Sequence, residues 1–173
     1  MKVTKSLIEK IQILDFFPRL EVINVFFEDY GENRGKVTIE SEGDAWSYFW
    51  GGTGYKTIQE FFLKAESDYL VGKLDIGIQK ELDNLDAEAI QEKARKYIIY
   101  LRKEKEISKK EAREQWDSVE EIWGDRFSGD ERILYRIYGE EWYLDYPQER
   151  NPEYQHLFSI VEAIKQSLLE QKV

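Results

Sequence analysis

A glycine-rich turn is the segment of this chain whose spacing comes nearest to ligand chemistry. The residues WGGTGYKT at 50–57 run from an expected strand into an expected helix. Backbone N–H groups at such a turn attract phosphate, together with a helix N-terminus. A P-loop, however, needs glycine where Trp50 and Tyr55 stand. Two interpretations stay open, a plain strand–helix connection and a site for a nucleotide-like or phosphate-containing ligand. The site would be formed by Gly51, Gly52, Thr53, Gly54, Lys56 and Thr57.

The strand before this turn is unusually aromatic. Trp46, Tyr48 and Trp50 alternate along it and share one face, with Phe49 opposite and Tyr55 following. Large aromatic side chains pack in cores, and they are also enriched at the centres of protein interfaces. One interpretation is core packing, and the other is a partly exposed partner site that includes Tyr55 and Lys56. Nucleic-acid stacking is not expected, because the surrounding charge lacks a basic groove.

Charge is the second strong signal. The 173 residues include 35 acidic and 25 basic residues, which gives a formal net charge of −10. An acidic run along an expected helix is the candidate contact for a basic partner, and it also raises the alternative of a DNA mimic. Its members are Glu114, Asp117, Glu120, Glu121 and Asp125. Residues 91–113 are instead rich in Lys and Arg. That basic segment is either a solvated face or a docking strip for an acidic partner.

Catalytic groups are scarce. The chain has no cysteine and one histidine, which excludes a thiolate zinc site, a cysteine nucleophile and motifs that need two histidines. His156 lies off the apolar stripe of its expected helix, so we expect it at the surface or rim. Among 35 acidic residues, no carboxylate pair stands out as a glycosidase pair. We therefore expect no enzyme, no catalytic residue, no metal site and no cofactor.

The elements that position these residues predict an α+β fold. Apolar residues at helical spacing and a capping box at Ser6 predict a helix over 6–14, ended by Pro18. Alternating segments at 20–30, 36–42 and 45–50 then predict a small antiparallel sheet of about three strands, with a turn at 31–35. A mainly helical C-terminal part packs with this sheet.

Helix starts are marked by short-range capping signals. Capping boxes begin at Thr57, Ser108 and Ser128, Asp86 is an expected N-cap, and Asn151-Pro152 starts the last helix. Residues 68–74 add a short helix. We expect one domain over 1–173. A sub-boundary near 84–86 would divide an αβ part, 1–84, from a helical part, 85–173.

Membrane and export signals are not apparent. Charged residues interrupt the apolar positions that follow the basic N-terminus, unlike a signal peptide. The longest apolar or aromatic run, 97–101, is far below the about 20 residues that a membrane span needs. The sequence predicts a soluble, cytoplasmic protein and leaves its oligomeric state open.

Several segments are similar to those of a known group of proteins. They are GKVTIE at 35–40, AWSYFWG at 45–51, EFF at 60–62, DYLVGKL at 68–74, AREQWD at 112–117 and NPEY at 151–154. In this pattern the chain resembles small acidic proteins carried by tailed phages and prophages, over most of its length. The resemblance transfers no functional residue. It implies a phage setting, in which small acidic proteins often bind and block a host machine such as a CRISPR or restriction system.

The function expected from these observations is that of a non-enzymatic accessory protein, acting in the host cytoplasm. Its partner would be a host protein that is basic or binds nucleic acid, because an acidic surface steers association with basic surfaces. Direct binding to nucleic acid or to a membrane is not expected.

Overall fold

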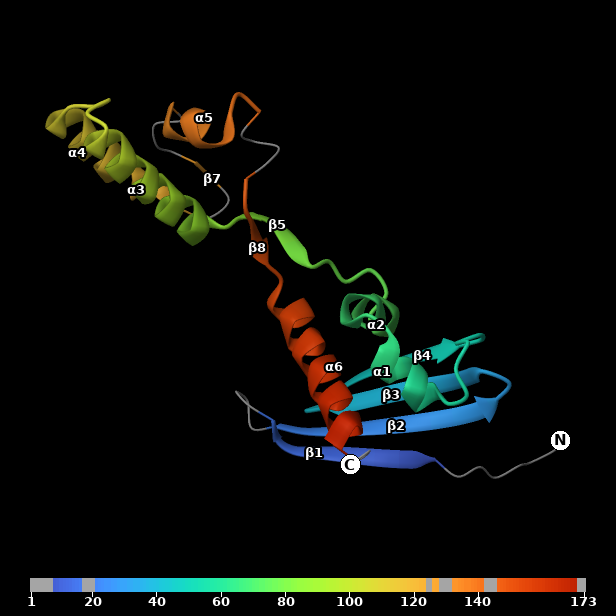
Figure 1. Ribbon diagram of the computed structural model, residues 1–173. Coiled ribbons are helices and arrows are strands. Elements are labelled where there is room, and N and C mark those ends of the chain that lie inside the picture. The colour runs from blue at the N-terminus through green and yellow to red at the C-terminus, as the bar shows by residue number, and fades with distance from the viewer. Residues whose placement is uncertain (1–7, 17–20, 124–125, 128–131, 142–145, 171–173) are drawn as a thin grey trace. The chain divides into compact units, whose positions relative to one another are not determined.

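The structure is a computed structural model, and it describes residues 8–16, 21–123, 126–127, 132–141 and 146–170. Its first four elements form an antiparallel sheet in the order β1-β2-β3-β4 (Figure 1). The strands are β1 (Glu9–Phe16), β2 (Glu21–Gly31), β3 (Arg34–Ser41) and β4 (Asp44–Trp50). The α+β class is confirmed, with four strands in this sheet in place of about three.

The extra strand corrects the helix predicted over 6–14. In β1, Ile11 pairs with Val25 of β2, and Ile13 pairs with Ile23. Ile11 is buried on the inner face, whereas Leu14, which belonged to the predicted helical stripe, is 61% exposed. Ile11 and Ile13 alternate at a period of two, whereas Ile8, Ile11 and Leu14 fit a helical period. Pairing with the long strand β2 gives β1 a ladder of backbone hydrogen bonds and so decides for the strand.

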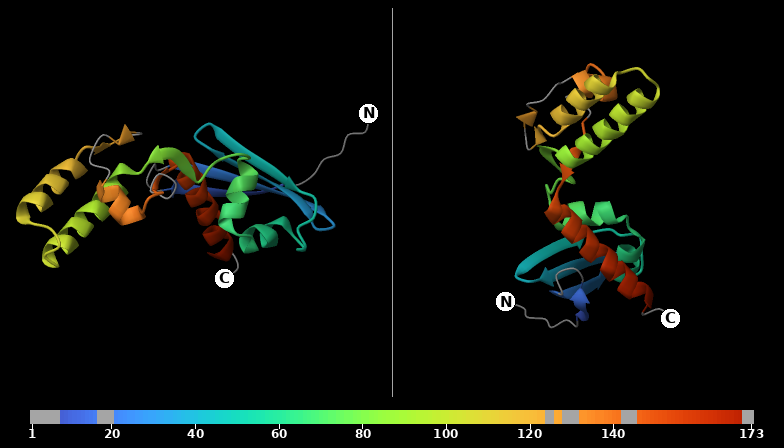
Figure 2. Two further views of the ribbon diagram at one scale, coloured as in Figure 1. Left: turned by 90° about the horizontal axis from the view of Figure 1, so that it is seen from above. Right: turned by 90° about the vertical axis from the view of Figure 1, so that its left-hand side faces the viewer.

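Three helices cover one face of the sheet. They are α1 (Ile58–Lys64), α2 (Ser67–Leu74) and α6 (Pro152–Glu170) (Figures 1 and 2). Both shorter helices contact α6, and in the sheet α1 contacts β2 and β3 while α2 contacts β4. The core between helices and sheet is fully buried and includes Val25, Phe27, Ile39, Phe62 and Leu157. Burial of apolar surface contributes about 25 cal/mol per Å², so the packing of these helices on the sheet is its main source of stability.

A second set of elements has its own apolar core. These are β5 (Glu81–Leu85), α3 (Ala87–Lys103), α4 (Lys109–Val119), β6 (Ile122–Trp123), β7 (Arg126–Phe127), α5 (Arg132–Tyr138) and β8 (Gln148–Arg150). The predicted stripe of α3 is buried at Ile90, Ala94, Ile98 and Leu101, and it packs with residues of α5 such as Leu134. β5 pairs with β8, and β6 with β7.

The chain contacts divide the protein into two compact units. Unit 1 comprises residues 1–78 and 152–173, and unit 2 comprises residues 79–151. This division differs from the expected sub-boundary near 84–86, because the C-terminal helix α6 belongs to the sheet unit. The apolar face of α6, with Val161 and Ile164, completes the core over the sheet.

Three of the six predicted helix starts are confirmed by side-chain caps. Thr57 accepts a hydrogen bond from the backbone N–H of Glu60, and Asp86 accepts one from that of Ala89. Ser108 and Glu111 form both hydrogen bonds of a capping box. The predicted box at Ser128 and Glu131 lies outside the described residues.

Candidate partner-binding surface

The aromatic strand β4 turns its inner face toward the helices, with Trp50 at the centre. Trp50 is only 4% exposed, and its ring lies 4.9 Å from that of Tyr48 and 5.4 Å from that of Phe61. The indole Nε1–H donates a 3.2 Å hydrogen bond to the hydroxyl of Tyr69. Trp46 is half-buried and packs against the same core. The core-packing interpretation therefore applies to Trp50 and, in part, to Trp46.

The rim of this group is open to solvent. Tyr55 is 40% exposed and Tyr69 is 44% exposed, and both rings lie within 6.4 Å of the ring of Phe61. We call Tyr48, Trp50, Tyr55, Phe61 and Tyr69 the aromatic cluster. The ammonium group of Lys73 lies 5.4 Å from the ring of Tyr48 and 5.7 Å from that of Tyr69, which is cation–π distance. The result is an aromatic surface with two exposed hydroxyl-bearing rings beside a positive charge, packed against the buried Trp50.

Sequence reasoning found only part of this cluster. Tyr48, Trp50 and Tyr55 were predicted from the strand and its turn, whereas Phe61 and Tyr69 come from α1 and α2. Lys73 also lies on α2. The predicted contact Lys56 is exposed next to Tyr55. Nothing in the local spacing links the helical residues to the strand, because their proximity depends on how the helices pack.

The opposite face of the sheet carries a smaller aromatic pair. Phe49 and Tyr30 are 51% and 45% exposed, and their ring centroids lie 5.9 Å apart. The hydroxyl of Tyr30 donates a 2.8 Å hydrogen bond to Glu28, and this bond raises the pKa of Tyr30 above its usual value. The aromatic side chains of β4 are therefore distributed over both faces, and only the inner face is covered by helices.

The glycine-rich turn and the start of α1 are held by hydrogen bonds to residues near the β2–β3 hairpin turn. The backbone N–H of Thr53 donates a 2.7 Å hydrogen bond to the carbonyl of Asn33. At the start of α1, the backbone N–H of Ile58 donates to the carboxylate of Asp29 at 3.1 Å, and the hydroxyl of Thr57 caps the helix. An anionic ligand would compete with that carboxylate for the same donors. The geometry of Gly51, Gly52 and Gly54, all exposed, thus offers the phosphate-site prediction no support.

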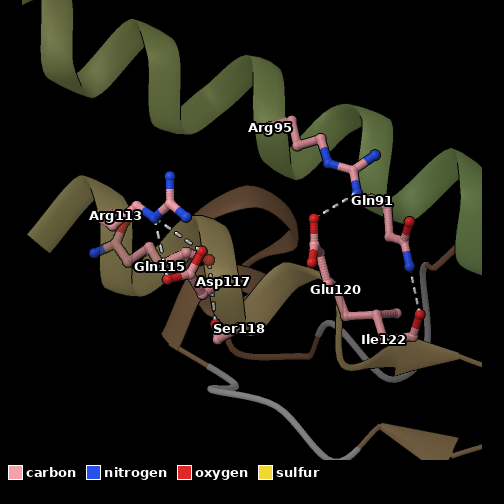
Figure 3. A network of polar contacts seen from close by, with 8 residues as sticks. All are labelled: Gln91, Arg95, Arg113, Gln115, Asp117, Ser118, Glu120 and Ile122. Atoms are coloured by element: carbon pink, nitrogen blue, oxygen red, sulfur yellow. Dashed lines mark hydrogen bonds and ion pairs between the residues drawn. The ribbon is translucent and has the colours of Figure 1, made fainter.

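The acidic run is paired with neighbouring cations. Asp117 lies 3.1 Å from Arg113, Glu114 lies 3.8 Å from Lys110, and Glu120 lies 4.0 Å from Arg95. Figure 3 shows the pairs of Asp117 and Glu120, together with the 2.6 Å hydrogen bond from Gln91 to the carbonyl of Ile122. Exposed pairs of this kind add little stability, but they reduce the negative field that a DNA mimic would need. Glu121 is exposed, and Asp125 lies outside the described residues.

A buried polar group in unit 1 was not predicted. Glu21 is 2% exposed and accepts a hydrogen bond from the hydroxyl of Ser41. The imidazole Nε2 of His156 lies 3.3 Å from the other carboxylate oxygen, and the His156 side chain is 13% exposed. His156 therefore lies nearer the interior than its helical projection suggested. The group spans β2, β3 and α6, and no sequence spacing links residues so far apart.

This polar group is not arranged as a catalytic triad. A nucleophilic serine needs a base that takes its proton, with an acid behind the base. Here the hydroxyl of Ser41 donates to the carboxylate of Glu21, and the carboxylate lies between the serine and His156. The hydrogen bond from Ser41 to Glu21 instead joins β3 to β2, and the imidazole of His156 on α6 lies beside the same carboxylate.

Neither a metal site nor a membrane span is found among the described residues. In that part of the chain, no three or more His, Cys, Asp or Glu side chains gather as metal ligands would. None of the helices described there has the length and apolar character to cross a membrane.

Comparison with known proteins gives one match. The model of a phage protein family matches residues 1–170, which is nearly the whole chain. No curated protein matches the chain. No solved structure matches it either.

Proposed function

The chain belongs to a phage protein family, and we propose that it is a non-catalytic accessory protein that binds a host protein through the aromatic cluster. The observation that carries this proposal is the exposure of Tyr55 and Tyr69 on a rigid base. Both rings remain about two-fifths open, while Trp50 beneath them is buried. Aromatic side chains held in this way lose little conformational entropy on binding, and Tyr and Trp dominate the energetics of interfaces.

The charge of the chain supports a basic partner in this proposal. A net charge of −10 at neutral pH repels nucleic acid and attracts basic surfaces. These forces act over about 10 Å, the Debye length at 0.1 M salt. The partner in this proposal is a basic or nucleic-acid-binding host protein in the cytoplasm. A nuclease of an antiviral defence system has such a surface, and its inhibition is the specific form that we propose.

Site-specific photo-crosslinking tests the contact surface. A photoreactive phenylalanine analogue replaces Tyr55 or Tyr69 in the full chain, which is expressed in the host during infection. The matched control is the same replacement at Tyr30, which is similarly exposed on the opposite face of the sheet. We expect one host protein to be crosslinked from positions 55 and 69 and not from position 30. Equal crosslinking from all three positions, or none from 55 and 69, would contradict the proposed surface.

Affinity measurements with the captured partner then test the energetics. We expect Tyr55→Ala combined with Tyr69→Ala to weaken binding at least about tenfold, which corresponds to about 1.4 kcal/mol. Tyr30→Ala should leave the affinity unchanged. The association rate should fall as salt is raised, because steering is screened. An association rate that does not change with salt concentration would contradict the proposed electrostatic attraction between the protein and its partner.

Inhibition itself is measured with phage and with the purified partner. We expect expression of the protein to raise plaque counts on hosts that carry the partner's defence system, and the double tyrosine variant to lose this effect. A DNA mimic predicts a different result, in which crosslinks form from Glu114 and Asp117 on α4 and duplex DNA competes for the partner.

A further inference from the structure

An open groove of about 900 Å³ runs between α3 and α4 in unit 2. The two helices are joined by a short connection and lie side by side (Figures 1 and 2). Apolar and aromatic side chains form the floor of the groove, namely Ile98, Ile99, Ala112 and Trp116. Ile99 is 45% exposed although it lies next to the buried Ile98. The floor therefore presents apolar surface to solvent on an otherwise highly charged unit.

Cations line the rim of this groove. They are Arg102, Lys103, Lys109, Lys110 and Arg113, and the carboxylate among the lining residues is Glu114. Lys110 pairs with Glu114, and Arg113 pairs with Asp117. Within the part of the chain that the structure describes, Arg102, Lys103 and Lys109 make no ion pair and no side-chain hydrogen bond. The groove thus combines an exposed apolar floor with three uncompensated positive charges on a protein whose net charge is negative.

Helix stability does not account for all of these cations. Arg102 and Lys103 lie in the last turn of α3, where positive charge is favoured by the helix dipole. Lys109 and Lys110 lie in the first turn of α4, where the dipole disfavours positive charge. Lys110 is balanced by its ion pair with Glu114, so Lys109 is the cation here whose placement the helix itself does not explain.

We propose that this groove is a second docking site, which binds an acidic amphipathic helix of a partner protein. A third helix laid between two helices buries one apolar stripe on the floor, and its flanking Asp and Glu side chains meet the cations of the rim. Nucleic acid suits the groove less well, because phosphate contacts use the cations and leave the apolar floor exposed. This site is separate from the aromatic cluster and does not rest on the function proposed above.

A peptide-display selection on the full-length protein tests the occupant without assuming a partner. The library holds random peptides of about 16 residues, long enough for about four helical turns. We expect enrichment of peptides that are net negative and carry apolar residues at spacings of three and four. Enrichment of neutral or basic peptides, or no enrichment, overturns the proposal.

Charge-reversal variants locate the binding site. Arg102→Glu combined with Lys109→Glu should lower the affinity for an enriched peptide at least about tenfold. The two new carboxylates would repel the acidic side chains that the original cations attract. The matched control is Lys56→Glu combined with Lys64→Glu. It changes the net charge equally. Lys64 lies in a last helical turn, as Arg102 does, and Lys56 lies just before the N-cap of α1, whereas Lys109 lies just after the N-cap of α4. An equal loss of affinity in both variants would indicate a general effect of net charge and would overturn the proposed site.

NMR chemical shifts of the full chain distinguish the acidic helix from other possible occupants of the groove. The enriched peptide should shift the backbone amide signals of Ile99 and Ala112 and the indole N–H signal of Trp116. Tighter binding of single-stranded or duplex DNA to the same residues, abolished by the groove variant, would overturn the helix as occupant. Concentration-dependent self-association that the groove variant abolishes would identify a second copy of the chain as the occupant and would also overturn it.

Discussion

Trp50→Ala removes the side chain that supports the aromatic cluster. An aromatic side chain of this class buries about 150–250 Å², which at about 25 cal/mol per Å² corresponds to about 4–6 kcal/mol. Truncation of buried Trp or Phe in cores typically costs about 3–5 kcal/mol. The hydrogen bond from the indole to Tyr69 adds about 1 kcal/mol or less. Because the unfolded chain already buries part of this area, we expect the free energy of unfolding of unit 1 to fall by about 4 kcal/mol.

Native-state hydrogen exchange, read by mass spectrometry, measures this loss in each unit separately. Backbone amides of β2 and β3 should exchange about a thousandfold faster in the variant, which is the equivalent of about 4 kcal/mol. Amides of α3, in unit 2, serve as the internal reference. Tyr55→Ala is the control variant, and we expect it to change exchange in β2 and β3 by less than about tenfold because its ring is 40% exposed.

If the amide exchange rates of β2 and β3 in Trp50→Ala stay within about tenfold of those in the original protein, the loss of stability is below about 1.4 kcal/mol, and the expected role of Trp50 is wrong. Trp50 would then not be a core residue, and Tyr55 and Tyr69 would lack a rigid support. The partner surface would have to be sought elsewhere on the molecule.

Three other substitutions test separate parts of the structure. Gly35→Ala should lower the melting temperature, since its Cβ would lie 2.6 Å from Cβ of Ile58, an overpacking that costs about 1–3 kcal/mol. Burial, with a hydrogen bond to Asp68, raises the pKa of Tyr154 to about 12. The folded state therefore keeps this proton while the unfolded chain loses it near pH 10, and stability should fall as pH rises from there to about 12. Chemical denaturation across that range should show a smaller fall for Tyr154→Phe. A hydrogen bond from the capping backbone N–H lowers the pKa of Glu111, so its stabilisation is present above its usual pKa and is lost as pH falls through the lowered value. Helix content measured by circular dichroism should show a weaker acid dependence for Glu111→Gln.

Short-range chemistry carried most of the successful predictions. The caps at Thr57, Asp86 and Ser108 depend on residues three positions apart, and the hairpin between β2 and β3 depends on a two-residue turn. Such signals are complete within a few residues, so one sequence is enough to read them.

Long-range packing limited the rest. The segment that forms β1 fits two periods, and its pairing with β2 decided between them. Three of the five residues of the aromatic cluster were predicted from β4 and the turn after it, but Tyr69 became part of it only through the packing of α2. Likewise, Glu21 and His156 meet across 135 positions of the chain, which no local pattern encodes.

The way in which unit 2 interrupts unit 1 has a consequence for how such a protein can change. The chain enters unit 2 and leaves it at neighbouring points, since Asn151 bonds through its backbone N–H to the carbonyl of Lys80 and through its side chain to that of Gln79. A stretch with adjoining ends can be excised, exchanged or enlarged while the strands and helices on either side keep their connections. The grooved helical insert can therefore be replaced or altered in length without breaking the connections within the aromatic sheet unit.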